Sequence, residues 1–354
     1  MSNVSSLHVP AEAPAQRAKW SFVTRRVDRS QAVRLLPHTG EVETGDLVLA
    51  EVARIGSHKR LQLSNGQFSP LWPGDRVVLA CADRFAVDQF EGRAALPTSG
   101  ADLLAGGGII GEVASKNGKL APATRLTVLG RLAKACGTPI NLAEYARAPA
   151  GLGSRPPVIG VLGTGMNAGK TAAAAGVVNG FARLGRRVTA IKATGTGAFG
   201  DLHEYDAAGA DQVLDFTDAG LPSTYRQPIA RVKDAVDLLL GHAATSDVAV
   251  VELADGVSQV ETATLLSSPG FAARFDLFLL AAPDAMAVQG GLAWLGQHRI
   301  VPALLTGLMT RAPLAAAEAT RSTGLPVLCR RTLADPATAS ALEGLVLRTR
   351  RSAA

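Results

Sequence analysis

A short apolar run that leads into a glycine-rich loop is the feature that most constrains this chain of 354 residues. Residues 158–162 are Val-Ile-Gly-Val-Leu, and the loop that follows ends in Gly169-Lys170-Thr171. Backbone N–H groups of such a loop can turn inward around phosphate oxygens, the lysine adds positive charge near the terminal phosphates, and the threonine hydroxyl can bind Mg²⁺. The Ala-rich segment 172–184 has helical character, and the amino-terminal end of that helix would attract the same anion. This order of strand, loop and helix predicts a site for the phosphate tail of a nucleotide.

The loop departs from the common motif in one respect. That motif has glycine five residues before the Gly-Lys pair, where this chain has Thr164, and the nearest glycine is Gly163. The competing interpretation is a chance glycine-rich turn ahead of an Ala-rich helix, but the complete order of parts favours a phosphate loop. The residues expected to contact the nucleotide are Gly163, Thr164, Gly165, Met166, Asn167, Ala168, Gly169, Lys170, Thr171 and Ala172.

The second half of the chain alternates apolar runs with helical stretches. Continuous Val, Ile and Leu runs that alternate with helices are typical of a parallel sheet covered on both faces. We therefore expect an α/β fold with the phosphate loop after its first strand. The expected strands are 158–162, 188–191, 248–252, 277–282 and 301–305, and the expected helices are 172–184, 230–241, 259–266 and 313–322.

The region before this domain has a different pattern of apolar and polar residues. Residues 21–95 alternate with period two and contain turn signals such as Gly45-Asp46 and Pro73-Gly74-Asp75, which predict short antiparallel strands in a small barrel or sandwich. A short helix is expected near 129–135. The run Gly106-Gly107-Gly108 could reach a nucleotide, although a flexible connector is the favoured interpretation.

Composition shifts suggest the domain boundaries. The expected division is a loose leader at 1–20, a β-rich domain at 21–150, a linker at 151–157, the α/β domain at 158–345 and a basic tail at 346–354.

Charged residues follow two of the later strands, where ligands of parallel sheets bind. Lys192 ends the run 188–191, and Thr194 and Thr196 follow it in a Thr/Gly loop. Glu252 ends the run 248–252, where a carboxylate is costly unless it binds a metal or water. An acidic stretch from 201 to 218 is either a solvated helix face or the source of a further Mg²⁺ ligand.

These residues resemble the dethiobiotin synthetase branch of the P-loop proteins, within the wider SIMIBI class. The resemblance covers about 156–330 and rests on Gly163-Thr164 with Gly169-Lys170-Thr171, on Lys192 with Thr196, on Asp206-Ala207-Ala208 and on Val251-Glu252. Asp255 stands where that family has glycine, and the segment 199–225 has no clear counterpart, which suggests a different substrate.

The resemblance implies an enzyme that uses Mg²⁺ and ATP to activate a carboxylate or carbamate by γ-phosphoryl transfer. Lys170, Lys192, Asp206 and Glu252 would be catalytic, with Thr171, Asp206 and Glu252 at the metal. The substrate, expected to be small and acidic, would contact Lys192, Thr194 and Thr196. Relatives are often homodimers.

The sequence also bears on the choice of nucleotide, on nucleic acid as a partner and on the location of the protein. Gly165 stands where MinD-like ATPases carry a further lysine, and the loop after 301–305 lacks a guanine-reading motif, so ATP is favoured over GTP. A formal charge of +6 with 5% aromatic residues does not favour nucleic acid as a partner. Three unevenly spaced cysteines, the absence of a secretory signal pattern and of a bilayer-length apolar run suggest a cytoplasmic protein that does not enter a membrane.

Two other functions remain open. One is a nucleotide-switched accessory ATPase or GTPase, metallochaperone-like or gating a partner enzyme, with the β-rich domain as its docking module. The other is a transferase built on the same scaffold. Release of ADP and phosphate that depends on a small substrate would favour the synthetase.

Overall fold

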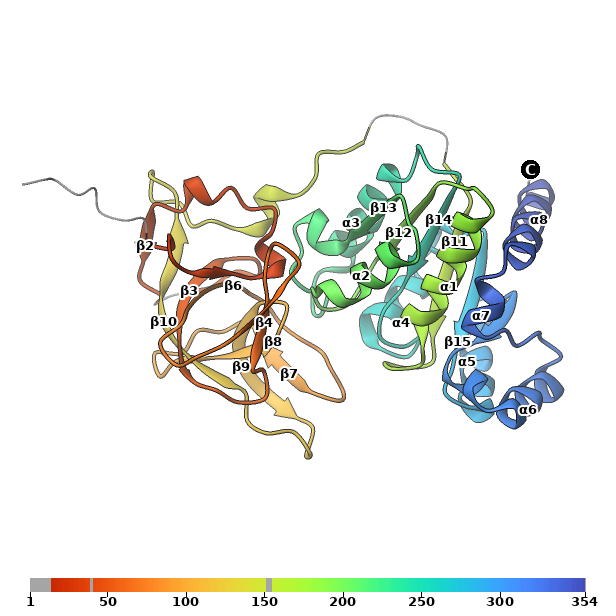
Figure 1. Ribbon diagram of the computed structural model, residues 1–354, viewed down its shortest axis with the longest axis horizontal. Coiled ribbons are helices and arrows are strands. Elements are labelled where there is room, and N and C mark those ends of the chain that lie inside the picture. Colours follow the sequence, from red (N-terminus) through yellow and green to blue (C-terminus); the bar gives the residue numbers. More distant parts are fainter. Residues whose placement is uncertain (1–13, 39–40, 151–154, 354) are drawn as a thin grey trace, which may run out of the picture.

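Two sheets of different kinds organise the chain, as the computed structural model shows (Figure 1). The structure describes residues 14–38, 41–150 and 155–353. The expected leader and linker lie partly outside these residues, as does the last residue of the expected basic tail. Among the described residues, no helix combines the length and the apolar character needed to cross a membrane.

The amino-terminal sheet closes into a barrel. Its strands follow the order β6-β3-β10-β8-β9, and a further pairing of β6 with β9 completes the ring. The ring strands are β3 (Leu47–Arg54), β6 (Arg76–Cys81), β8 (Ala101–Ala105), β9 (Ile109–Lys116) and β10 (Thr124–Ala133). The added strands are β1 (Lys19–Trp20), β2 (Arg34–Leu36) and β7 (Phe90–Arg93), and β4 (Arg60–Gln62) pairs with β5 (Phe68–Pro70) alone.

The prediction of a short helix near 129–135 is wrong, because strand β10 continues through this stretch up to Ala133. The register of β10 against β3 shifts between Val128 and Gly130. Such a bulge inserts a residue into one strand and breaks the period-two alternation that identifies strands in sequence.

The carboxyl-terminal sheet is parallel, as predicted, with the strand order β13-β12-β14-β11-β15-β16. Its strands are β11 (Val158–Gly163), β12 (Val188–Lys192), β13 (Gln212–Asp215), β14 (Val248–Glu252), β15 (Leu277–Ala281) and β16 (Leu304–Thr306). Their Val, Ile and Leu side chains are buried on both sides of the sheet, which is why these strands read as continuous apolar runs.

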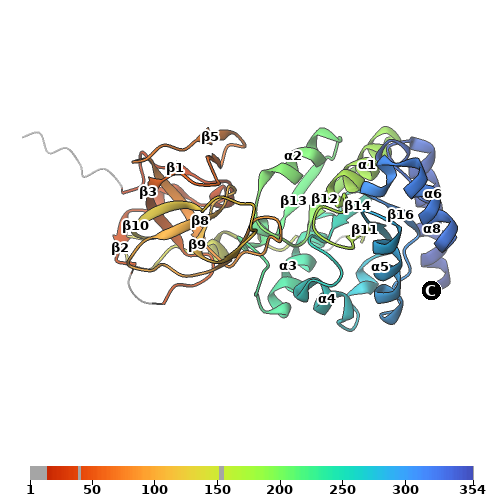
Figure 2. The same ribbon diagram turned by 90° about the horizontal axis from the view of Figure 1, so that it is seen from below.

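Helices cover both faces of this sheet, and Figure 2 shows α1 and α2 on one side with α3, α4 and α5 on the other. One apolar core joins α1 (Lys170–Arg183), α2 (Phe199–Ala207), α7 (Arg330–Leu333) and α8 (Pro336–Ala353) to the sheet. The opposite core includes α3 (Ile229–His242), α4 (Val260–Ser267), α5 (Ala285–Gln297) and α6 (Pro313–Thr323). The expected basic tail at 346–354 is helical up to Ala353, and Val346 is buried against the sheet.

The short 3-10 helices connect these elements. They are η1 (Phe22–Thr24), η2 (Arg29–Gln31), η3 (Leu142–Tyr145), η4 (Phe216–Ala219), η5 (Ala272–Arg274) and η6 (Leu308–Arg311).

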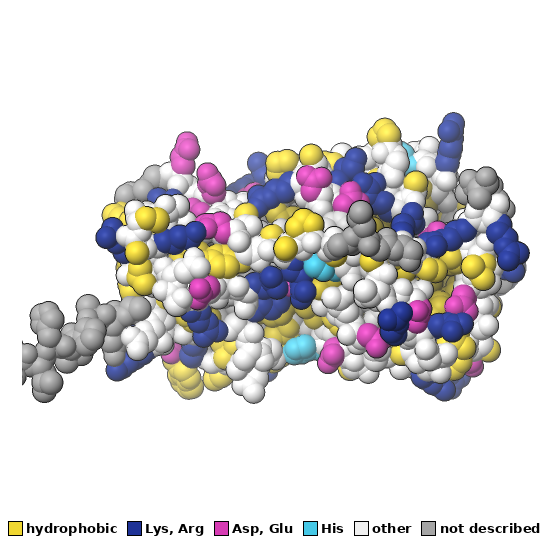
Figure 3. Space-filling model, turned by 90° about the horizontal axis from the view of Figure 1, so that it is seen from above, with side chains coloured by type: hydrophobic (Ala, Val, Ile, Leu, Met, Phe, Trp, Pro, Cys, Tyr) yellow, Lys and Arg dark blue, Asp and Glu magenta, His cyan; other side chains and the backbone are white. Residues whose placement is uncertain are grey.

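The barrel and the α/β domain make specific contacts with each other. The Arg25 guanidinium donates to Asp215 Oδ1 at 2.9 Å and to Asp218 Oδ2 at 2.8 Å. The Phe199 backbone N–H donates to Gln62 Oε1 at 2.7 Å, and the Phe199 ring lies in the apolar core of the barrel. On the face seen in Figure 3, Lys and Arg side chains gather midway along the molecule.

Gly107 lies where the two domains come closest. A Cβ at this position would lie 1.9 Å from the Gly197 carbonyl oxygen, so only glycine fits there. We expect Gly107→Ala to push the domains apart and to lower the free energy of unfolding by about 1–3 kcal/mol, the usual cost of overpacking.

The thermal unfolding midpoint measures this effect. Gly118→Ala is the matched control, because nothing lies within 4 Å of the added methyl group at that position. Equal midpoints for the two variants would show that the close approach at Gly107 is not required.

Candidate functional site

The predicted phosphate loop joins β11 to α1. Gly169 has φ 99° and Asn167 has φ 62°, so the chain turns through left-handed conformations before helix α1 begins at Lys170. The Lys170 ammonium curls back over the loop and donates to the carbonyl oxygens of Gly165 at 2.9 Å and Asp255 at 2.5 Å. Burial lowers the pKa of Lys170. The ammonium therefore stands over the concave side of the loop, where phosphate oxygens would lie.

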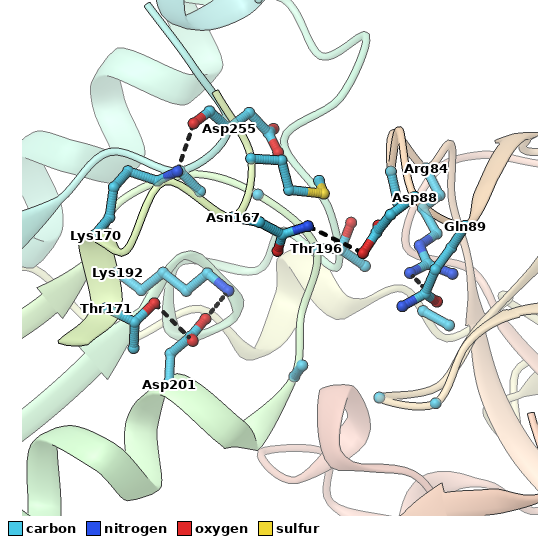
Figure 4. A pocket seen from close by; sticks show the side chains of 18 of the residues that line it. Arg84, Asp88, Gln89, Asn167, Lys170, Thr171, Lys192, Thr196, Asp201 and Asp255 are labelled. Atoms are coloured by element: carbon cyan, nitrogen blue, oxygen red, sulfur yellow. Dashed lines mark hydrogen bonds and ion pairs between the residues drawn. The ribbon is translucent and has the colours of Figure 1, made fainter. Parts of the chain in front are cut away.

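A cleft of about 970 Å³ opens beside this loop and reaches the barrel (Figure 4). Its α/β side is formed by residues within 166–172, by Lys192, by residues within 195–201 and by residues within 252–255. Its barrel side is formed by residues within 57–62, 84–89 and 105–107. The volume lies at the upper end of the range of small-molecule sites, so the cleft can hold more than a phosphate group.

Lysine, hydroxyl and carboxylate groups meet at the carboxyl edge of the sheet. Lys192 ends β12 and forms an ion pair with Asp201, which lies in the first turn of α2. The Thr171 hydroxyl lies 3.1 Å from Asp201 Oδ1 and 3.4 Å from Glu252 Oε1. The Tyr205 hydroxyl donates to the other oxygen of Glu252.

The electrostatics of this group follow from burial and pairing. Burial raises the pKa of Glu252, and Asp201 adds to that increase. Burial would also raise the pKa of Asp201, but the Lys192 ammonium outweighs it and the pKa lies below its ordinary value. Lys192 is buried, which would lower its pKa, yet Asp201 and Glu252 raise it above the ordinary value. Lys192 and Asp201 are therefore an ionised pair facing the cleft.

Most of the residues predicted for the site lie around the cleft. Those that line it are Met166, Asn167, Gly169, Lys170, Thr171, Ala172, Lys192, Thr196 and Glu252. The others in the loop, Gly163, Thr164, Gly165 and Ala168, belong to its backbone and are not part of the lining. Thr194 is buried, and its hydroxyl accepts the Ala254 N–H at 2.8 Å, so it joins the ends of β12 and β14.

Asp206 requires a correction. It is exposed on α2 and does not line the cleft, whereas Asp201 contacts Thr171 and Lys192. Five residues along a helix rotate a side chain by about 140° from its starting direction, so the two aspartates cannot face the same way. The position expected for a metal-binding carboxylate is therefore that of Asp201.

The oxygen atoms here suit a hard cation. Thr171, Asp201 and Glu252 bring a hydroxyl and two carboxylates to one point, and oxygen donors of this kind are those that Mg²⁺ prefers. Among the described residues, no group of three or more His, Cys, Asp or Glu side chains could hold a metal ion by itself. A metal here would need oxygen atoms from a bound phosphate or from water.

The barrel contributes residues that the sequence did not single out. Arg84, Gln89 and His58 line the cleft opposite the phosphate loop, and Asn167 of the loop donates to Asp88 of the barrel at 3.2 Å. Gly106 and Gly107 also line the cleft, so this run is part of its wall and not simply a connector. Only the folded barrel brings 58, 84 and 106 together, and no local motif marks them.

The chain shares low sequence identity with several solved structures. No family model matches the chain, and no curated protein matches it. The chain is similar to the cell division protein FtsY from Thermotoga maritima, with 21% identity over 55% of this chain and 69% of that chain and a TM-score of 0.35. A GDP complex of the signal recognition particle receptor FtsY from Elizabethkingia anophelis has 14% identity over 54% of this chain and 63% of that chain, with a TM-score of 0.35.

The GDP complex of the signal recognition particle 54 kDa protein from Aeropyrum pernix K1 gives 16% identity over 57% of this chain and 50% of that chain, again with a TM-score of 0.35. The parallel sheet, the phosphate loop after β11 and helix α1 that begins at Lys170 make the carboxyl-terminal half an α/β P-loop domain, preceded by a β-rich domain.

Proposed function

We propose that this protein is a Mg²⁺-dependent P-loop enzyme that uses ATP to activate a carboxylate or carbamate on a small acidic substrate. The observation that carries the proposal is a second buried lysine, Lys192, in the same cleft as the phosphate loop. Lys170 faces the nucleotide phosphates, and Lys192 is paired with Asp201 in this structure. A Mg²⁺ ion bound by Asp201 would free the Lys192 ammonium to bind a substrate anion.

The chain's own residues then have distinct roles. Lys170 and the loop N–H groups would hold the phosphates, and Thr171, Asp201 and Glu252 would hold Mg²⁺, which neutralises phosphate charge when bound. Tyr205 would fix the orientation of Glu252 through its hydrogen bond. Lys192 would hold the substrate oxygen in line with the γ-phosphorus.

The reaction is a phosphoryl transfer followed by displacement. The substrate oxygen attacks the γ-phosphorus, the bond to the bridging oxygen of ADP breaks, and an acyl phosphate forms. A nucleophile then attacks the acyl carbon and releases inorganic phosphate. Positioning and charge neutralisation supply most of the rate enhancement in such transfers.

We propose that the adenine base of ATP lies in a second hollow beside the phosphate loop. It has a volume of about 340 Å³ and lies beside the start of α1 and the loop after β16. Its polar lining includes Thr306, Thr310, Arg311 and Arg330, and no carboxylate is among the described residues that form it. A carboxylate is the acceptor that would best pair with the N–H groups of guanine.

One observation favours a nucleotide-driven switch as a second candidate function. The segment that follows Lys192 leads to Phe199, which is buried in the barrel core, and then to Asp201 at the phosphate end. A conformational change at Asp201 on nucleotide binding would therefore be transmitted through Phe199 to the barrel. The barrel could then bind or release a partner.

Ligand titrations separate these functions. We expect Mg²⁺-ATP to raise the thermal unfolding midpoint more than Mg²⁺-GTP, with about 2.7 kcal/mol of stabilisation at 100 times the dissociation constant. ADP release should then depend on an added small carboxylate. Hydrolysis that is independent of carboxylates and accompanied by altered hydrogen exchange in the barrel would favour the switch, and no stabilisation by either nucleotide would contradict both functions.

A further inference from the structure

Arg84 is a buried cation at the barrel side of the cleft, and it forms no ion pair with another described residue. Its backbone is held by the bridge to Gly92, with the Arg84 N–H donating at 3.1 Å and the Gly92 N–H at 3.0 Å. Its side chain lines the cleft and is 7% exposed (Figure 4). The barrel therefore holds the backbone of Arg84 in place, and the side chain is buried in the wall of the cleft.

The hydrogen bonds of Arg84 are incomplete. Nη2 donates to Gln89 Oε1 at 2.8 Å, but Nε and Nη1 have no partner among the described residues. Burial lowers the pKa of Arg84 to about 10, and the charges of Asp88 and Asp255 offset only part of that decrease. The group is still charged near neutral pH, and a buried charge that lacks a partner is costly unless an anion completes it.

The surroundings favour an anion as that partner. His58 holds its Nδ1 3.1 Å from the Leu103 carbonyl oxygen, and burial together with Arg84 lowers its pKa to about 4, so it is neutral near pH 7. Lys59 and Arg60 also line the barrel side of the cleft. Among the described residues of that side, Asp88 is the one carboxylate. The barrel side of the cleft thus carries an excess of positive charge, and an anion could replace Gln89 Oε1 as the acceptor of the guanidinium.

We propose that Arg84 and Gln89 bind a second anionic group of the substrate. Given the proposed function, on which this inference rests, the substrate is a small acid with two anionic groups. One is the carboxylate or carbamate activated beside Lys192, and the other is a carboxylate or phosphate held by Arg84. The two cationic ends of one cleft select an acid that can span them.

The test compares wild-type protein with Arg84→Met, which keeps an unbranched side chain but removes the guanidinium and its charge. ADP release is followed with monocarboxylates, dicarboxylates such as succinate, and phosphorylated carboxylates. We expect an acid with two anionic groups to support turnover, and its KM to rise by about 10- to 100-fold in Arg84→Met, as for the loss of a charged hydrogen bond. Calorimetric titration with succinate and with inorganic phosphate separates the two anions, and Mg²⁺-ATP binding is measured beside them.

The controls distinguish recognition from folding. Arg54→Met removes an exposed arginine of β3 and should leave the KM unchanged. Arg84→Met should unfold at the same temperature as wild type or higher, because it removes an unpaired buried charge. A lower midpoint would mean that Arg84 serves the fold.

The outcomes for this inference and for the proposed function differ. Unchanged KM and anion binding in Arg84→Met, with normal Mg²⁺-ATP binding, would overturn the anion site and leave the proposed function standing. Loss of anion binding in that variant, in a protein that shows no carboxylate-dependent ADP release, would support the anion site and contradict the proposed function.

Discussion

Lys170→Ala should lower nucleotide hydrolysis by about 10³-fold, because the variant loses the charge that faces the terminal phosphates. In the structure, the ammonium is held by the carbonyl oxygens of Gly165 and Asp255 and is buried at the mouth of the loop. Phosphate oxygens would replace these neutral partners and gain more from the positive charge as negative charge develops on them. Steady-state release of inorganic phosphate from Mg²⁺-ATP measures the loss.

Lys119→Ala is the matched control for this experiment. Lys119 is exposed in the loop between β9 and β10 and lies outside the lining of the cleft. Its replacement should leave hydrolysis unchanged. Normal hydrolysis by Lys170→Ala would show that the loop is not the site of chemistry.

Arg25→Ala should destabilise the protein by about 3–5 kcal/mol, the usual effect of removing one partner from a buried ion pair. Arg25 joins Asp215 and Asp218, whose side chains are 1% and 5% exposed. Asp218 would retain Arg147 at 3.4 Å and Arg26 at 3.8 Å. Among the described residues, the Asp215 side chain would keep only Thr217, and its Oδ2 already lacks a hydrogen-bond partner. The loss is measured as a lower unfolding midpoint in urea.

An exposed ion pair provides the comparison. Arg187 and Asp247 are 62% and 40% exposed and lie 3.3 Å apart. Arg187→Ala should change stability by no more than about 1 kcal/mol, since exposed pairs contribute little. If both variants lose the same amount, the Arg25 pair does not hold the two domains together.

The sequence predicted those parts of the site that a short run of neighbouring residues can identify. The phosphate loop, Lys192 and Glu252 each follow a buried strand, and a parallel sheet brings such strand ends to one edge. Asp206 was predicted because Asp206-Ala207-Ala208 resembles a family motif, whereas in the fold Asp201, in the first turn of α2, contacts Thr171. The sequence alone could not show which aspartate faces Thr171, because that depends on where the helix begins and how it packs.

The barrel shows why the rest could not be predicted. Its turn signals identify strands, but pairing such as that of β6 with β9 joins segments far apart in the chain. No sequence pattern distinguishes Arg84 from the other arginines of the chain. Its burial beside Gln89, which only the fold shows, marks it as a candidate for binding. The prediction of a flexible connector at Gly106-Gly107-Gly108 was wrong for the same reason. Gly107 packs against Gly197, which is 90 residues away in the chain.

The position of Phe199 also bears on how such a chain can change in evolution. This ring starts helix α2 of the P-loop domain, yet it packs in the barrel core against Phe22 and also contacts the half-exposed ring of Phe68. The barrel is therefore not a module that could be lost or exchanged while the other domain stays intact. Any replacement would have to cover the same ring and hold the segment that carries Asp201, so the two halves are bound to diverge as one unit.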